Sequence, residues 1–327
     1  MTFRIQLPRF RAWANLTSLF ALSWIAASSA EAEECQLKRM ASLDMADSSG
    51  GSVLVPLTIN GSPKMFLVDT AGIYSSITES TINEMHLQTA KAAVTVYSAS
   101  GKKMDRATDI QSLLIGNNEA KHIHLLVTPD FDNKTIAGTL APDLLKLFDV
   151  ELDFAAKKLN LFSPAHCEGK VVYWAREYTD VAFRMTSGDH IAFQMSLDGH
   201  DLTTALDTGS SVTTLLEPAA YRLYNLDEKS ANVDKSGDLG IALYRYQFNS
   251  LALSGIAVNH PLIYVVPDLA ERAFRNQHTS KMDSDPLYGV SLDKQQLILG
   301  TNVLRKLHLY IAYKEHKIYV TAADAHL

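Results

Sequence analysis

An internal repeat is the feature of this 327-residue chain that most constrains its fold. The segment "LVDTAGIYSSI" at 67–77 aligns without a gap with "ALDTGSSVTTL" at 205–215. Farther along, "APDLLKLFDVELDF" at 141–154 aligns in the same way with "GTNVLRKLHLYIAY" at 300–313. The offsets are 207 − 69 = 138 and 300 − 141 = 159, so the second copy carries about 21 additional residues between the two matches. A long repeat that occurs twice predicts two similar lobes related by a pseudo-twofold axis.

Short segments rich in β-branched residues predict that both halves are mostly β. Examples are "SVLVPLTI" and "HIHLLVT" in the first half and "HIAFQMSL" and "HPLIYVV" in the second. Helical patterns are limited to short pieces such as "EPAAYRLY" and "TNVLRKL". The content of 47% hydrophobic and 20% charged residues is typical of a globular protein. We expect an N-terminal lobe over 33–166, a connector over 167–180 and a C-terminal lobe over 181–327.

Residues 1–32 have the layout of a secretory signal peptide. Three arginines precede the short apolar core "LTSLFALSWIAA", and small residues follow it, with Ala30 and Ala32 as the expected cleavage positions. The core is shorter than the roughly 20 residues that a membrane span needs, and an uncleaved anchor is the alternative. We expect an exported protein, periplasmic or secreted, with no stable membrane span after cleavage. The net charge of −6 and the lack of a basic run argue against nucleic acid as a partner.

The chain has two cysteines, Cys35 and Cys167. In an oxidising compartment such a pair is expected to form a disulfide, which would tie the mature N-terminus to the connector. Two separate buried thiols are the alternative. The "HIH" sequence places His122 and His124 on one face of a strand without a third ligand nearby, so we expect a solvent-facing pair and no metal site.

Each Asp-Thr segment follows an apolar strand and precedes small and hydroxyl residues, and "LILGTNVLRKL" supplies a later apolar-apolar-Gly sequence before a short helix. This combination resembles the active-site regions of aspartic peptidases, both pepsin-like and, most closely, bacterial retropepsin-like peptidases joined into one bilobal chain. A single Asp-Thr-Gly occurs by chance in many proteins, whereas two Asp-Thr loops in register, each followed by its own matching strand-helix unit, are specific. The resemblance covers nearly all of the mature chain and implies a mostly β fold of two pseudo-symmetric β-barrel lobes with short helices.

The resemblance implies that Asp69 and Asp207 form a catalytic dyad. Two neighbouring carboxyl groups do not both ionise easily, so they share one proton and their titrations split apart. One can then act as the base that activates a water molecule and the other as the acid that protonates the leaving group. Thr70 and Thr208 look like the buried threonines of the family, whose hydroxyl groups hydrogen-bond across the lobe interface. Ordinary strand threonines are the alternative for both.

The first lobe departs from the family pattern at its glycines. Ala71 stands where the second lobe has Gly209, and Gly72 follows where the second lobe has Ser210. Glycine is favoured there because it tolerates unusual backbone angles and close approach of other atoms. If the loop requires a positive φ, Ala71 is strained by about a kcal/mol or more.

A second departure lies in the strand-helix unit, where Ala141 replaces the glycine found at Gly300 in the second lobe. Both losses lie where backbone is expected to pack tightly around Asp69.

Two hairpins are candidates for flaps over a cleft between the lobes: "VYSASGKKMDRA" and "VDKSGDLGIALYRY". Gly101, Gly237 and Gly240 are the expected flexible tips, and Tyr97 is a candidate for a flap tyrosine that hydrogen-bonds near the dyad. Ordinary surface hairpins are the alternative. A peptide or an unfolded protein is the expected substrate, and because both lobes lie in one chain, we expect a monomer.

Two functional hypotheses follow. The protein is an exported aspartic endopeptidase with a slightly remodelled Asp69 loop, or it is a degenerate member that binds peptides or partner proteins without hydrolysis. Retention of both aspartates and both threonines favours the enzyme. The sequence contains no GxSxG elbow, P-loop or dinucleotide fingerprint, so an α/β-hydrolase is disfavoured and no cofactor is expected.

Overall fold

The computed structural model describes residues 36–48, 50–97, 102–186, 188–227, 229–230, 234–235, 244–266, 295–325 and 327. The expected signal segment, residues 1–32, lies outside the described residues. Residues Gln36–Leu327 group into one compact unit. The described part of the chain is mostly β with short helices, which confirms the predicted fold class. No helix in this part is long and apolar enough to cross a membrane.

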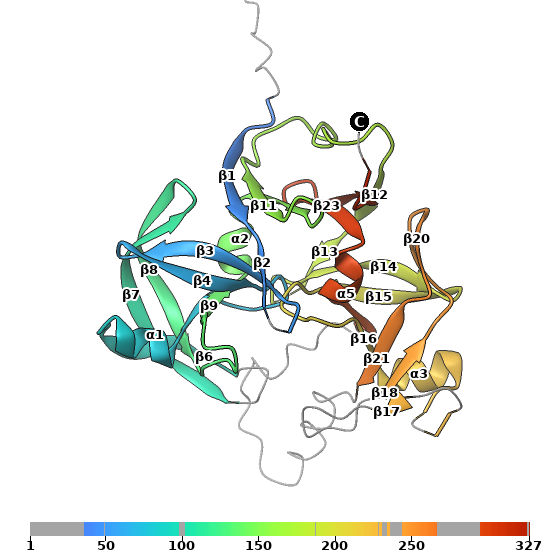
Figure 1. Cartoon of the computed structure of the whole chain (residues 1–327), viewed down its shortest axis with the longest axis horizontal. Helices are drawn as coiled ribbons and strands as arrows, with labels where there is room; N and C mark the ends of the chain where they lie inside the picture. Colours follow the sequence, from blue (N-terminus) through green and yellow to red (C-terminus); the bar gives the residue numbers. More distant parts are fainter. Residues whose placement is uncertain are drawn as a thin grey trace, which may run out of the picture. The chain divides into compact units, whose positions relative to one another are not determined.

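The first lobe is a sheet in which the described strands follow the order β2-β3-β4-β9-β5-β8-β7-β6 (Figure 1). The strands are β2 (Ala46–Asp47), β3 (Val53–Ile59), β4 (Ser62–Val68), β5 (Ser76–Thr78), β6 (Thr89–Tyr97), β7 (Lys103–Ile115), β8 (Asn118–Thr128) and β9 (Ile136–Leu140). β3 also pairs with β7, which curls the sheet into a barrel. β3 buries Val55, Leu57 and Ile59 and exposes Pro56, as expected for a strand whose alternate side chains face a core.

The second lobe repeats this design. Its described strands follow the order β17-β18-β21-β16-β22-β15-β14-β19-β20, and β13 pairs with β14. The strands are β13 (Arg184–Met185), β14 (Ile191–Leu197), β15 (His200–Leu206), β16 (Thr214–Leu216), β17 (Asp234–Lys235), β18 (Tyr244–Gln247), β19 (Ser250–Leu253), β20 (Ile256–Asn259), β21 (Leu262–Val266) and β22 (Leu297–Leu299).

One strand in each lobe is threaded between two others in the same way. β9 runs parallel to β4 and antiparallel to β5, whereas β22 runs parallel to β15 and antiparallel to β16. The three strands around each Asp-Thr segment therefore correspond one to one between the lobes, as the repeat predicted.

A third sheet joins the halves and was not part of the sequence prediction. Its described strands follow the order β1-β11-β10-β23-β24-β12. They are β1 (Arg39–Asp44), β10 (Asp149–Asp153), β11 (Lys158–Phe162), β12 (Thr179–Ala182), β23 (Leu307–Ala312) and β24 (Lys317–Ala322). At its centre Glu151 pairs with Tyr310, and 151 + 159 = 310, so the pseudo-twofold axis of the repeat passes through this pair. β12 begins inside the segment expected to be a connector, 167–180.

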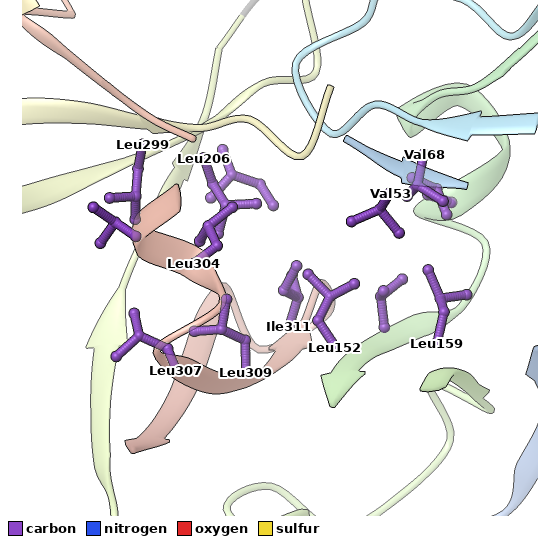
Figure 2. Packing of buried hydrophobic residues seen from close by; sticks show 14 of the residues in the cluster. Val53, Val68, Leu152, Leu159, Leu206, Leu299, Leu304, Leu307, Leu309 and Ile311 are labelled. Atoms are coloured by element: carbon purple, nitrogen blue, oxygen red, sulfur yellow. The ribbon is translucent and has the colours of Figure 1, made fainter. Parts of the chain in front are cut away.

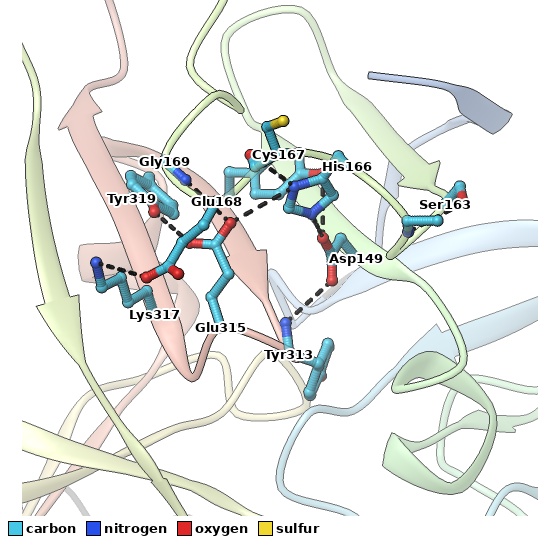
Figure 3. Close-up of polar contacts among 12 residues, drawn as sticks. Asp149, Ser163, His166, Cys167, Glu168, Gly169, Tyr313, Glu315, Lys317 and Tyr319 are labelled. Carbon is cyan, nitrogen blue, oxygen red and sulfur yellow. Dashed lines mark hydrogen bonds and ion pairs between the residues drawn. The ribbon is translucent and has the colours of Figure 1, made fainter. Parts of the chain in front are cut away.

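The helices are short: α1 (Glu79–Glu84), α2 (Pro142–Leu145), α3 (Glu217–Tyr224) and α5 (Thr301–Leu304). α2 and α5 occupy equivalent positions, since each follows the threaded strand of its lobe. The connector is fixed to the central sheet by buried polar contacts (Figure 3). There the Asp149 carboxylate pairs with His166 and accepts the Tyr313 N–H at 3.0 Å.

Both lobes and the central sheet contribute to one hydrophobic core. Figure 2 shows Val68 and Leu206, the last residues of the two strands that lead to the aspartates, in the same cluster as Leu152 and Ile311 of the central sheet. All four are at most 1% exposed. Burial of each such side chain contributes about 1.5–3 kcal/mol, so the strand ends that carry the aspartates are held firmly.

Candidate active site

The two aspartates stand at the ends of equivalent strands. Asp69 follows β4, and its backbone N–H donates to the Leu140 carbonyl of β9 at 3.0 Å. Asp207 follows β15, and its N–H donates to the Leu299 carbonyl of β22 at 3.1 Å. Equivalent pairs of strands therefore fix the two aspartates: β4 and β9 hold Asp69, and β15 and β22 hold Asp207.

The threonines after the aspartates are fully buried and bond across the boundary between the lobes. The Thr70 hydroxyl donates to the Leu206 carbonyl at 2.8 Å, and the Thr208 hydroxyl donates to the Val68 carbonyl at 2.7 Å. Each hydroxyl also accepts the backbone N–H of the other threonine at 3.1 Å. This reciprocal set holds the two loops face to face.

The carboxyl groups of Asp69 and Asp207 lie close enough that the negative charge of Asp69 contributes to the raised pKa of Asp207. Their closeness is also visible at Gly209, where an added Cβ atom would lie 2.7 Å from Asp69 Cγ and 3.2 Å from Asp207 Oδ1. Sequence reasoning predicted this pair, and the structure brings it together at the pseudo-twofold axis.

Backbone N–H groups point at both carboxylates. Gly209 and Ser210 donate to Asp207 Oδ1 at 2.9 and 3.1 Å, and Ala71 donates to Asp69 Oδ1 at 3.1 Å. These bonds favour the ionised form of each acid and orient its oxygens.

Burial dominates the titration of the pair. Burial and the negative charge of Asp69 raise the pKa of Asp207 to about 7, against the opposing N–H groups of Ser210 and Gly209. Burial likewise raises the pKa of Asp69 above its ordinary value, and the N–H groups of Ala71 and Gly72 and the neighbouring Asp207 carboxyl oppose the rise. Such a pair retains one shared proton up to near-neutral pH, so one carboxylate can accept a proton while the other donates one.

Ala71 does not have a positive φ, and neither does Gly209. The backbone strain that a left-handed conformation would impose on Ala71 is therefore absent. The second lobe needs glycine for a different reason, because a side chain at Gly209 would collide with the Asp69 carboxyl group.

The other two departures of the first lobe are coupled. A Cβ atom on Gly72 would lie 3.2 Å from the Ala141 methyl carbon and 2.9 Å from Asp69 Oδ2, so glycine at this position leaves room for the alanine. The second lobe has the opposite arrangement, with a side chain at Ser210 and a glycine at Gly300, where a Cβ would lie 2.2 Å from the Val212 carbonyl oxygen. In the second lobe the backbone of Val212 and Thr213 is what requires glycine at position 300.

A hydroxyl side chain bonded to a carboxylate or amide oxygen supports each loop from behind, and sequence reasoning did not identify this pair. In the first lobe Asp143 Oδ1 accepts the Ser75 N–H at 2.9 Å and the Ser75 hydroxyl at 2.6 Å. In the second, Asn302 Oδ1 accepts the Thr213 N–H at 2.7 Å and its hydroxyl at 2.8 Å. The signal was present, because these residues occupy matching positions in the two alignments.

The hydroxyl groups of Ser75 and Thr213 in turn bind the residues that directly follow the threaded strands β9 and β22. Ser75 Oγ accepts the Ala141 N–H at 2.9 Å, and Thr213 Oγ1 accepts the Gly300 N–H at 3.1 Å. The support is therefore the same in both lobes, although one acceptor is a carboxylate and the other an amide.

The predicted flaps are described only at their bases. β6 and β7 pair as far as Tyr97 and Lys103, and β17 and β18 pair through Lys235 and Tyr244. Gly101, Gly237 and Gly240 lie outside the described residues, and the Tyr97 side chain is not described either.

The other sequence predictions concern sites away from the aspartates. Cys167 lies beside His166 at the start of the connector (Figure 3), and Cys35 is outside the described residues, so their pairing stays a prediction. His122 and His124 on β8 are both exposed, and His122 Nδ1 lies 3.2 Å from Asp109 Oδ2. In the described part of the chain no cluster of three or more metal-ligating side chains occurs.

Residues 55–143 match a family model described as aspartyl protease. The match lies in the first lobe and includes Asp69, Ala71 and Ala141. A search of curated proteins finds no relative.

Among solved structures, the chain resembles the crystal structure of conglutin gamma, a unique basic 7S globulin from lupine seeds. The two are 8% identical with a TM-score of 0.50, and the match covers 88% of this chain and 95% of that one. Such a likeness concerns the fold alone. The first lobe is thus similar in sequence to aspartyl proteases, and the chain as a whole is similar in fold to a bilobal β protein.

Proposed function

We propose that this protein is an exported aspartic endopeptidase that hydrolyses peptide bonds with a water molecule activated by Asp69 and Asp207. The observation that carries the proposal is the approach of two half-buried carboxyl groups in matched loops, which the reciprocal threonine hydrogen bonds hold face to face. The ionised carboxylate takes a proton from water, and the resulting hydroxide attacks the carbonyl carbon of the scissile bond. The protonated partner gives its proton to the carbonyl oxygen, which forms a tetrahedral gem-diol. The proton taken from water then passes to the nitrogen as the C–N bond breaks, and the other carboxylate takes a proton from a hydroxyl of the collapsing diol, so the pair again holds one proton.

The alternative is a degenerate protein that binds peptides without hydrolysis. It rests on the glycine losses at Ala71 and Ala141. The geometry speaks against a damaged loop, because Ala71 has no positive φ and Gly72 leaves space for the Ala141 methyl. A degenerate site also has no need for paired acids, since buried carboxyl groups are costly to keep.

The expected substrate is a peptide or an unfolded protein, bound by a single copy of the chain after export. The site described here needs no second chain, since each half supplies one aspartate and one threonine.

The test is cleavage of an unstructured protein by wild type, Asp69→Asn and Asp207→Asn, followed by mass spectrometry of the products. We expect each substitution to abolish cleavage, because neither asparagine can carry or accept the shared proton. The matched control is Asp44→Asn in β1, where the side chain is 84% exposed, and it should cleave as wild type does. Cleavage that survives both dyad substitutions would eliminate this mechanism.

The pH dependence gives a second check with a defined sign. Activity should fall as the pH rises through about 7, because the pair then loses the proton that the acid must donate. It should also fall in acid, once both carboxyl groups are protonated and no base is left. A rate that keeps rising above pH 8 would contradict the shared-proton assignment.

A further inference from the structure

Two turns, one in each lobe, extend toward the opposite lobe. They are related by the repeat offset of 138. The described residues are Ser48 with 50–52 in the β2–β3 turn and Thr186 with 188–190 in the β13–β14 turn. Ser48 N–H donates to the Ser52 carbonyl at 2.9 Å, and Thr186 N–H donates to the His190 carbonyl at 3.0 Å. The Ser48 hydroxyl oxygen accepts the Ser52 N–H at 2.9 Å, and that of Thr186 accepts the His190 N–H at 3.2 Å.

Each turn is anchored on the helix of the opposite lobe. In the β2–β3 turn the Gly51 carbonyl accepts from the Thr301 hydroxyl at 2.9 Å and from Arg305 Nη2 at 2.8 Å. In the β13–β14 turn Asp189 pairs with Lys146, which matches Arg305 at the offset of 159. Both turns therefore join the lobes next to the two aspartate loops.

The two turns differ at the residue nearest the loops. The Ser52 hydroxyl donates to the carbonyl of Gly209, two residues after Asp207 in the chain, at 3.2 Å. His190 holds the equivalent place in the other turn, and neither of its ring nitrogens has a hydrogen-bond partner although the residue is 4% exposed. Among the described residues of the two turns, Ser52 thus gives the Asp207 loop a side-chain hydrogen bond that His190 does not give the Asp69 loop.

The hydrogen bond from Ser52 acts on Asp207 through the rigid Gly209–Ser210 peptide. The Gly209 carbonyl and the Ser210 N–H belong to one planar trans peptide, so they point in opposite directions. Ser52 holds the oxygen on one side, and the N–H on the other side donates to Asp207 Oδ1 at 3.1 Å. Fixing one end of the peptide fixes the direction of the other.

We propose that Ser52 is a positioning residue for Asp207: across the lobe boundary, its hydroxyl orients the Gly209–Ser210 peptide so that the Ser210 N–H points at the carboxylate. The role of this bond in catalysis rests on the proposed peptidase function, whereas its effect on Asp207 itself does not. Loss of the hydroxyl weakens a bond that favours the ionised acid, so Asp207 should become easier to protonate.

The experiment compares Ser52→Val with Ser52→Thr, which have the same shape and differ in the hydroxyl. The side-chain carboxyl carbons are labelled with ¹³C and titrated by NMR, with Asp207→Asn used to assign the Asp207 signal. In Ser52→Val the Asp207 midpoint should move up by about half a pH unit, and in Ser52→Thr it should stay at the wild-type value. If the valine variant does not fold, Ser52→Ala takes its place.

His190→Ala is the matched control in the other turn, and it should leave the Asp207 midpoint unchanged. If cleavage is detectable, the basic limb of the kcat/KM profile should move with the NMR midpoint in Ser52→Val. An unchanged Asp207 midpoint in Ser52→Val overturns the proposal, even if the wild type is an active peptidase. A shifted midpoint in a wild type without hydrolytic activity supports the proposal while the peptidase function fails.

Discussion

Replacing Gly209 with alanine should lower the catalytic rate far more than it lowers the stability of the fold. The new Cβ atom would lie 2.7 Å from Asp69 Cγ and 2.8 Å from its Oδ1. Carbon atoms in contact prefer about 3.5–4.0 Å, so the Asp69 carboxyl group must move by about 1 Å to accept the methyl. A misplacement of this size at a reacting group costs about 100-fold in rate.

The loss of stability should be smaller in comparison. Overpacking by one methyl group costs about 1–3 kcal/mol in a tight core, and here the atoms that must yield belong to one side chain. We therefore expect kcat to fall about 100-fold in Gly209→Ala while the protein remains folded at 25 °C. The assay is kcat on a peptide identified from the cleavage products, with the unfolding midpoint in urea measured on the same preparation.

Ala71→Gly is the matched comparison, because Ala71 occupies the equivalent position in the first lobe. The repeat leads us to expect its methyl group beside the Asp207 carboxyl, already accommodated, so its removal should retain activity. Wild-type kcat in Gly209→Ala would refute the reasoning that close approach of the carboxyl groups is what requires glycine.

Three further predictions concern the support of the loops. Thr208→Val removes the donor to the Val68 carbonyl and the acceptor of the Thr70 N–H, and it should lower the free energy of unfolding in urea by about 2–4 kcal/mol; an unchanged midpoint would show that these bonds do not hold the lobes. Gly300→Ala places a Cβ 2.2 Å from a backbone oxygen, so it should reduce the yield of folded protein as well as activity, which analytical gel filtration checks. Burial raises the pKa of Asp143 above its ordinary value of 3.8, so its ionisation opposes folding at neutral pH. Asp143→Asn should therefore raise the thermal midpoint at pH 7, with the gain shrinking as the pH falls toward 4; equal gains at both values would contradict this sign.

Much of the fold and the pair of aspartates could be predicted from the sequence because the same pattern occurs twice in the chain. The offset of 138 relates the Asp-Thr segments and the two crossing turns, and the offset of 159 relates α2 to α5. A duplicated pattern removes the chance matches that make a single Asp-Thr-Gly uninformative.

The central sheet could not be predicted in the same way. Its edge strands β1 and β12 are short, and its middle pair, β10 and β23, joins residues about 159 apart, so no local pattern indicates the pairing. The helix α1 was also missed, because its sequence ESTINE has one apolar residue and so shows no apolar face, although Thr78 caps its N-terminus through the Thr81 N–H.

The details of the site depend on contacts that sequence does not contain. Strain at Ala71 was expected only if the loop required a positive φ, and the backbone avoids that region. The bond from Ser75 to Asp143 spans 68 residues, and the bond from Ser52 to Gly209 spans 157. Such contacts follow from the packing of the lobes and not from the residues alone.

Locating hydrogen by neutron diffraction tests the account most directly. In a deuterated crystal grown below pH 7, we expect a single deuteron between facing carboxyl oxygens of Asp69 and Asp207. Two ionised carboxylates at that pH, or carboxyl groups too far apart for one deuteron to bridge them, would contradict the account.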